Sequence, residues 1–329
     1  MIKLKINTIS GLEYDITGMV KTVSWGGDIN TLPRKIEVGL FNTADITIGN
    51  KLVNIEAGNM ATLYKDDEEV FRGYIFKTST DQSGNDSFTA YDELIYTTKN
   101  NVTILVKDKT ASEVIAELFQ KYGIQIGSIQ PTTYKIKKLL FQNQTIADVI
   151  TKCLEEDTRN TGQHYTWFAS KGLVYLWTRK KAQISTVDID NIISGTNEVS
   201  IEDLRTQVFV TKGSLDPDES TDVKFASELV EDKYAAEKYG VMQAVEEAWD
   251  SATVAEMKNI GNTVLASLNE PTITSSIEFL GDITCKTGRI INVEDKLTGM
   301  TGKYYITSDN HTWDSGVYKM QLQLSKKLK

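Results

Sequence analysis

The chain has 329 residues, of which 25% are charged and 40% are hydrophobic. That balance is typical of a globular protein with a buried core, and the length predicts two or three domains. No apolar run approaches the roughly 18 residues that cross a bilayer, and the chain does not open with the apolar core of a signal peptide. We therefore expect a protein made in a cytoplasm, without stable membrane insertion.

The net charge of −9 is spread unevenly along the chain. Residues 1–100 carry 10 basic and 14 acidic side chains, residues 101–197 carry 12 and 9, and residues 198–329 carry 14 and 22. The outer segments are thus acidic, at −4 and −8, around a middle segment at +3. Because a nucleic-acid-binding surface needs clustered Lys and Arg to displace counterions, we expect no sequence-specific nucleic acid partner.

Residues 1–100 predict an N-terminal β module. The chain opens with three apolar residues at alternate positions, Ile2, Leu4 and Ile6, which is the pattern of a half-buried strand. The acidic tip at 65–69 could bind a cation, although a solvated turn explains its Asp and Glu residues better. The other predicted features are a strand around Ile36–Leu40, a hairpin of Ala61–Tyr64 with Val70–Phe76, a turn at 82–85 and a strand at Ser87–Tyr91.

Residues 101–197 predict a compact α+β domain. Two helices are each expected to begin at a threonine with an acidic residue three positions on, Thr110 with Glu113 and Thr145 with Asp148. An apolar stripe follows each cap, so both helices should pack against a sheet. Two aromatic-rich strands, His164–Ala169 and Gly172–Thr178, are expected to supply that sheet.

Residues 198–329 predict a helix-containing segment followed by a C-terminal β module. The predicted elements are a strand at Gln207–Lys212, an exposed loop at 213–218, helices at 229–239 and 254–268, and strands at Thr272–Leu280, Arg289–Val293, Lys303–Ser308 and Val317–Ser325. The helix at 254–268 has the same cap as the two earlier helices, Thr253 with Glu256. The predicted class is therefore α+β and mainly β, with two β modules flanking an α+β middle domain.

The residues that usually carry metal or acid–base chemistry are few. The chain has two histidines, His164 and His311, and neither lies in an H-x-x-x-H or H-E-x-x-H spacing. His164 is expected in an aromatic strand and His311 in a loop at 308–313, where structural roles explain them better than ligand or base roles. Cys153 and Cys285 follow no metal or redox spacing and are expected to be reduced core thiols.

Two further patterns bear on chemistry. The run Gly299–Lys303 has part of a phosphate-binding loop, but Leu297 stands at the first glycine position and Tyr304 at the Ser/Thr position, so a β-turn is favoured. The cluster Glu155-Glu156-Asp157 offers carboxylates to a glycosidase, yet a solvated helix end explains it better. We expect a protein that is not an enzyme, with no catalytic residues, no cofactor and no metal.

Four stretches, taken in order, resemble the phage late-control gene D family of contractile-tail baseplate hubs, and most of all the PBSX-type prophage hub. The likeness spans nearly the whole chain, and the order of the stretches carries it. They are Val70–Ile75, Phe88–Leu94, the pair of threonine-initiated helices, and a C-terminal set at Gly281-Asp282, Gly288–Val293, Gly302–Ile306 and His311–Tyr318.

The resemblance implies a structural virion protein of a contractile injection system, with one β-barrel tube domain at each end. In such hubs a homotrimer forms a pseudo-sixfold ring that leaves a channel and joins the hexameric tail tube to the central spike. The implied partners are the tail tube protein, the spike protein, a LysM-bearing tube initiator or baseplate neighbour, wedge proteins and the tape measure protein. The implied location is the baseplate of a virion, a defective prophage particle or a bacteriocin, after assembly in the host bacterial cytoplasm.

Three ideas stay open beside this interpretation. If the two acidic segments line the channel, DNA would slide past a wall of like charge. A tail-associated peptidoglycan hydrolase is an alternative, because 45 acidic residues leave room for a carboxylate pair. A cell-wall-binding module is another, with Tyr165, Trp167, Tyr175 and Trp177 stacking on sugars, although core packing explains these rings better.

Overall fold

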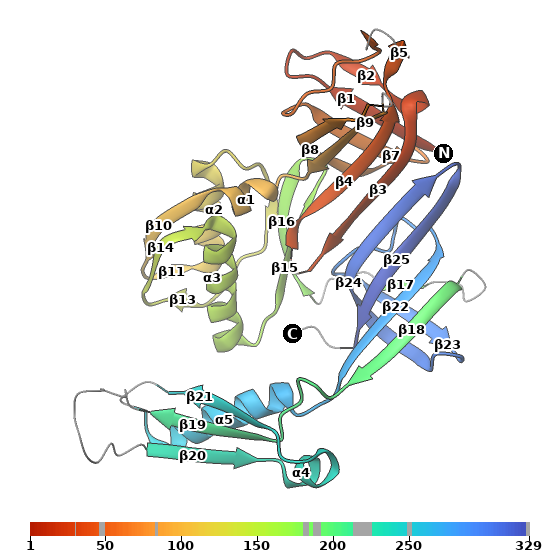
Figure 1. Cartoon of the computed structure of the whole chain (residues 1–329). Coiled ribbons are helices and arrows are strands. Elements are labelled where there is room, and N and C mark those ends of the chain that lie inside the picture. The colour runs from red at the N-terminus through yellow and green to blue at the C-terminus, as the bar shows by residue number, and fades with distance from the viewer. Residues whose placement is uncertain are drawn as a thin grey trace. The chain divides into compact units, whose positions relative to one another are not determined.

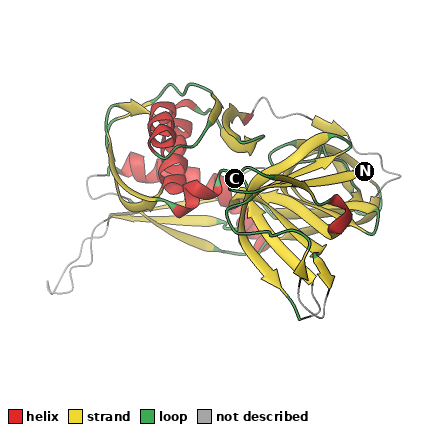
Figure 2. Cartoon of the chain, turned by 90° about the horizontal axis from the view of Figure 1, so that it is seen from above, coloured by secondary structure: helices red, strands yellow, loops and turns green. Residues whose placement is uncertain are grey.

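The structure is a computed structural model that describes residues 1–29, 31–45, 50–82, 85–179, 184–186, 192–212, 226–248 and 252–326. The turn predicted at 82–85 and the loop predicted at 213–218 lie partly or wholly outside the described residues. Strands predominate over helices (Figure 2), so the predicted α+β, mainly β class is confirmed. None of the helices in the described ranges is long and apolar enough to span a membrane.

The chain divides into two compact units. Unit 1 contains Met1–Thr196 and Ser275–Lys329, and unit 2 contains Asn197–Thr274. Segments from both ends of the chain therefore contribute to one unit, and unit 2 is inserted between them in sequence. This division is coarser than the three segments expected from sequence, and the three-domain organisation stays a prediction.

A 13-stranded sheet is the main feature of unit 1 (Figure 1). Most of it follows one path, in the order β18-β22-β25-β24-β3-β4-β9-β8-β7-β1-β2, while β23 pairs with β24 and β17 pairs with β23. The N-terminal strands are β1 (Ile2–Asn7), β2 (Glu13–Asp15), β3 (Val20–Asp28), β4 (Thr31–Phe41), β7 (Met60–Lys65), β8 (Glu68–Thr80) and β9 (Asn85–Tyr91). The others are β17 (Ile184–Thr186), β18 (Ile192–Ser200), β22 (Thr272–Leu280), β23 (Ile290–Asp295), β24 (Met300–Asp314) and β25 (Val317–Ser325).

Each end of the sheet has its own hydrophobic core. The alternation at Ile2, Leu4 and Ile6 places all three side chains in the N-terminal core, as predicted. The predicted hairpin is β7–β8, in which Asp66 and Asp67 take positive φ values in the turn. A short antiparallel pair of β5 (Thr43–Asp45) with β6 (Asn50–Lys51) and a 3₁₀ turn at Thr17–Met19 complete the N-terminal elements.

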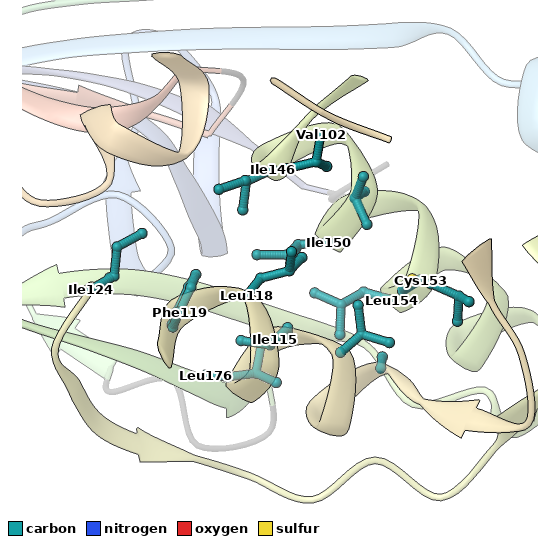
Figure 3. Packing of buried hydrophobic residues seen from close by; sticks show 14 of the residues in the cluster. Val102, Ile115, Leu118, Phe119, Ile124, Ile146, Ile150, Cys153, Leu154 and Leu176 are labelled. Carbon is teal, nitrogen blue, oxygen red and sulfur yellow. The ribbon is translucent and has the colours of Figure 1, made fainter. Parts of the chain in front are cut away.

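The helices and strands of the middle segment share one hydrophobic core. Its helices α2 (Ala111–Lys121) and α3 (Ile146–Thr161) begin at the predicted threonines, and both capping boxes are present. Their apolar stripes meet residues such as Leu176 from the strand pair β15–β16 (Figure 3). The remaining elements are α1 (Ile95–Lys99), β10 (Asn101–Val106), β11 (Lys109–Thr110), β12 (Ile126–Ile129), β13 (Lys135–Ile136), β14 (Leu139–Thr145), β15 (Tyr165–Ser170) and β16 (Leu173–Thr178).

Unit 2 is a three-stranded sheet with one long helix against it (Figure 1). The elements are β19 (Gln207–Lys212), β20 (Ala226–Glu231), α4 (Lys233–Tyr239), β21 (Gln243–Glu247) and α5 (Val254–Leu268). The helix predicted at 254–268 is confirmed, with its capping box, but the helix predicted at 229–239 begins only at Lys233. The reason is that Val230 is buried in the sheet core, and Asp232 then caps α4 by accepting the backbone N–H of Ala235.

The boundary between the two units shows which residues carry the negative charge of the third segment. Unit 2 holds 6 basic and 16 acidic residues, a net charge of −10, whereas residues 275–329 hold 8 and 6, a net charge of +2. The charge of −8 on the third segment therefore comes from unit 2, and the C-terminal strands are mildly basic. The C-terminal β module is therefore not acidic, so the idea of a channel lined by two acidic β modules is supported for the N-terminal module alone.

A close approach between β3 and β24 predicts a sensitive position at Gly26. A Cβ added there would lie 2.0 Å from the carbonyl oxygen of Asp309, so Gly26→Ala must push the strands apart. We expect a loss of about 1–3 kcal/mol in the free energy of unfolding, measured by urea denaturation. Gly18→Ala is the control, because its Cβ would have no neighbour within 4 Å, and a comparable loss there would contradict a steric cause at Gly26.

Candidate functional site

The pairing of β3 with β24 is the candidate functional site, because it joins the strands from the two ends of the chain. The antiparallel register runs from Asp28 opposite Ser308 to Thr22 opposite Asp314. Gly26 lets the backbone of Asp309 approach, and Gly27 leaves room for the side chain of Arg34, which lies within 3.1 Å of where its Cβ would be. Two consecutive glycines inside a strand were the signal for this close approach, and sequence reasoning missed it.

A buried ion pair crosses this seam. The guanidinium of Arg34 on β4 donates Nη1–H to Oδ1 of Asp309 at 2.8 Å and Nη2–H to Oδ2 at 2.5 Å. Thr287 donates to the same Oδ1 from its backbone N–H and its hydroxyl. Burial alone would raise the pKa of Asp309, but the charge of Arg34 and the hydrogen bonds from His311 and Arg34 outweigh it and hold this pKa far below its usual range. Asp309 is therefore ionised, and both of its carboxylate oxygens have hydrogen-bond partners.

His311 is buried at the same seam and both of its ring nitrogens have partners. Nδ1 lies 2.8 Å from the hydroxyl of Tyr318, and Nε2 lies 3.0 Å from the carbonyl oxygen of Cys285 and 3.2 Å from Oδ2 of Asp309. Since those two oxygens only accept, Nε2 carries a hydrogen, and in the neutral form of the ring Nδ1 accepts from the hydroxyl of Tyr318. The predicted loop at 308–313 is wrong, because His311 lies inside β24, where the long register with β25 continues the strand.

Aromatic rings enclose this histidine. Trp25 stacks on His311 at 5.2 Å and on Tyr318 at 5.4 Å between ring centroids. The Tyr318 ring in turn lies over Gly281, where an added Cβ would come within 2.3 Å of the ring carbons. Burial raises the pKa of the Tyr318 hydroxyl, so it stays protonated and donates. These groups pack closely at the seam, and both ring nitrogens of His311 have hydrogen-bond partners.

A second buried carboxylate lies beside the ion pair, at the end of β9. Asp92 accepts the backbone N–H of Arg34 at 3.2 Å and that of Leu94 at 3.1 Å. Burial raises its pKa to about 7, with the neighbouring Glu93 adding to the rise, while the backbone hydrogen bonds and the charge of Arg34 oppose it. Asp92 belongs to the stretch Phe88–Leu94 that carried the family resemblance, yet nothing local in that stretch signalled its burial.

The sequence-predicted carboxylate cluster does not form an acid pair. Asp157 is buried and accepts from the backbone of Tyr134 at 2.9 Å and from the hydroxyl of Tyr165 at 2.9 Å. Glu155 pairs with Lys152, and Glu156 pairs with Arg159. The three carboxylates thus have separate partners, and α3 extends beyond them to Thr161.

The remaining candidate residues have structural surroundings. His164 is exposed and precedes β15, so its predicted place in the strand is wrong by one residue. The β-turn favoured at Gly299–Lys303 is misplaced, because the turn before β24 lies at residues 296–299 and Met300 already begins that strand. The tip carboxylates Asp66 and Glu69 pair with Lys65 and Arg72. Across the described ranges, no three His, Cys, Asp or Glu side chains gather as a metal site.

The cysteines and aromatic strands also pack as core elements. Cys153 and Cys285 are buried thiols, as predicted, and burial raises the pKa of the Cys153 thiol to about 12. Tyr165 and Trp167 pack against the middle core. Tyr175 and Trp177 instead contact Phe168, at ring-centroid distances of 5.4 and 4.9 Å. The four rings proposed as a sugar platform therefore belong to two groups.

Removing Arg34 should leave the buried carboxylate of Asp309 without its charged partner. We expect Arg34→Met to lower the free energy of unfolding by about 3–5 kcal/mol, because the buried Asp309 would lose its charged partner. Lys35→Met is the matched control on the same strand, since Lys35 and Glu37 form an exposed pair and should contribute about 0.5 kcal/mol. Urea denaturation of both variants checks the contrast, and equal effects would argue against a structural role for the buried pair.

Asp92 should make stability depend on pH. Its folded pKa of about 7 exceeds the unfolded value of about 3.9, so the folded protein holds a proton between these values. This contribution is full below the unfolded pKa and is lost as the pH rises through about 7. We expect Asp92→Asn to flatten the fall in stability between about pH 4 and pH 7, as followed by thermal unfolding at about six pH values. Asp314→Asn, at an exposed aspartate of β24, should retain the wild-type slope.

Comparison with known proteins places this fold among tail proteins. The 43 kDa tail protein of prophage MuSo2 from Shewanella oneidensis shares it at a TM-score of 0.73, with 13% identity over 98% of this chain and 97% of the other. A type VI secretion component from E. coli, described as structurally similar to the T4 tail proteins gp27 and gp5, matches at a TM-score of 0.59 and 10% identity over 99% of this chain and 77% of the other.

The sequence comparisons also cover nearly the whole chain. Phage-like element PBSX protein XkdQ of Bacillus subtilis is 24% identical over 314 residues, which span 94% of this chain and 93% of the relative. A family model described as YQBQ-like matches residues 23–325, from the start of the β3–β24 seam to the end of β25. Because that match covers nearly the whole chain, the protein belongs to the YQBQ-like family.

Proposed function

We propose that this protein is a structural hub subunit in the baseplate of a contractile phage tail or tail-derived particle. The observation that carries the proposal is the fold-wide likeness to a prophage tail protein, which includes the sheet that joins both ends of the chain. The relation to a PBSX protein over nearly the full length supports the same role. The likeness to a component of a type VI secretion system extends it to contractile machines in general.

In the proposed hub, three copies form a pseudo-sixfold ring that joins the hexameric tail tube to the central spike. The support is that each chain carries two strand-rich ends with separate hydrophobic cores, so three copies would supply six similar modules. Each module would close as a barrel within the ring, as the late-control gene D resemblance implies. A ring subunit must hold its two modules at one angle, and the buried ion pair of Arg34 with Asp309 favours such rigidity.

The end strands of the main sheet suit an assembly of several chains. Within the described ranges the sheet path ends at β18 on one side and at β2 on the other, and both strands have largely exposed residues. An open strand edge presents unpaired N–H and C=O groups that other chains can pair with. The proposed partners are the tube and spike proteins, a LysM-bearing neighbour, wedge proteins and the tape measure protein.

The geometry gives less support to the alternative functions. A hydrolase would need two carboxylates facing one substrate, whereas Glu155, Glu156 and Asp157 have separate partners. A sugar-binding platform would need its rings on one surface, whereas Tyr165 and Trp167 pack in the core. We therefore propose a protein that is not an enzyme and needs no cofactor.

Counting copies in the assembled particle tests the hub proposal. We expect electron cryo-microscopy to find three copies of this chain around the tail axis, between the tube and the spike. One copy or six copies per particle would contradict the proposed ring. A zymogram on purified cell walls addresses the hydrolase alternative separately, and we expect the purified chain to leave the walls intact.

A further inference from the structure

One face of the sheet in unit 2 has no covering element among the described residues of that unit. The helix α5 packs against the other face, which contributes Val208, Val210 and Val230 to the core (Figure 1). On the open face Phe209 lies directly opposite Leu229 on β20 and Val245 on β21. Leu229 is 47% exposed and Val245 is 62% exposed. The three strands thus present one apolar row to the outside.

Acidic residues border this apolar row. Glu231 lies two positions from Leu229 on β20, and Glu247 lies two positions from Val245 on β21, so both carboxylates share the open face. No ion pair in the described part of the chain involves either residue. Unit 2 as a whole has a net charge of −10. A second copy of the same acidic face would therefore be repelled. An apolar row bordered by carboxylates favours a partner surface that is apolar with basic residues at its border.

The β10–β14 pair in unit 1 has the complementary chemistry. Leu105 and Leu140 lie opposite each other and are 49% and 60% exposed. Lys107 directly follows β10 and Lys138 directly precedes β14, and the alternation of side chains places both lysines beside the two leucines. Both lysines are exposed, and no ion pair within the described ranges uses either of them. This face also combines an apolar centre with uncompensated charge.

We propose that the open face of unit 2 binds the β10–β14 face of a second copy of this chain. Each face supplies an apolar centre with charge at its border, which is the usual arrangement of a protein interface, and the two charges are opposite. Because the two faces differ, the contact is head-to-tail, and repetition closes a ring when the rotation permits. The inference deepens the proposed hub, since it names a contact between copies, but the purified chain is enough to test it.

Charge reversal on each face tests this contact directly. One variant carries Glu231→Lys with Glu247→Lys, and the other carries Lys107→Glu with Lys138→Glu. Each variant alone should self-associate roughly a hundredfold more weakly than the wild type, because like charges meet at the interface. An equimolar mixture should form pairs of unlike variants, detected by sedimentation and by co-purification through two different tags. Val245→Ser should weaken self-association without any change in charge.

Matched controls decide what a negative result means. Glu202→Lys with Glu237→Lys makes the same charge change at exposed positions of unit 2 away from the open face, and it should associate like the wild type. Failure of the two reversed variants to pair in the mixture overturns the proposal, as does wild-type chain that stays monomeric at its highest soluble concentration. Equal weakening by the control also overturns it. A particle with three copies whose purified chain fails these tests would leave the hub proposal intact and remove only this contact.

Discussion

The hydrogen-bonded seam between β3 and β24 makes one sheet from strands at the two ends of the chain. A slip of one residue along such a seam moves every side chain to the opposite face. It would separate Asp309 from Arg34, and breaking a buried ion pair costs several kcal/mol. The ion pair therefore specifies the register more than it adds to stability. The two hydrophobic cores flanking the seam depend on that register, because each is built from strands that extend outward from it.

The same seam explains how an insertion is tolerated between the last strand of the middle segment and the C-terminal strands. Unit 2 has its own core of Val208, Val210, Val230, Met257 and Leu265, so its folding does not use the main sheet. It also holds the excess negative charge of the chain, while the remainder is close to neutral at +1. The uneven charge along the sequence thus belongs to one inserted unit, and the strands that resemble a tube module are not strongly acidic.

Local patterns in the sequence predicted much of the fold. The three capping boxes at Thr110, Thr145 and Thr253 are present because a threonine and an acidic residue three positions on determine a helix start without tertiary help. The start of α4 was misplaced because Leu229 and Val230 fit a helical stripe as well as a strand, and only pairing with β19 decides between them. The candidate site was not predicted, since Arg34 and Asp309 lie 275 positions apart and neither is unusual locally.

One buried contact limits how sequences in this family can diverge. It involves Gly281, His311 and Tyr318. The Tyr318 ring lies where any side chain at position 281 would have to go, and its hydroxyl is the partner of Nδ1 of His311. A larger residue at 281 would displace the ring and leave a buried imidazole nitrogen without its hydrogen-bond partner. Substitutions at these three positions are therefore tolerated only together, so an alignment of relatives should show them changing as a set, even where the strands around them vary freely.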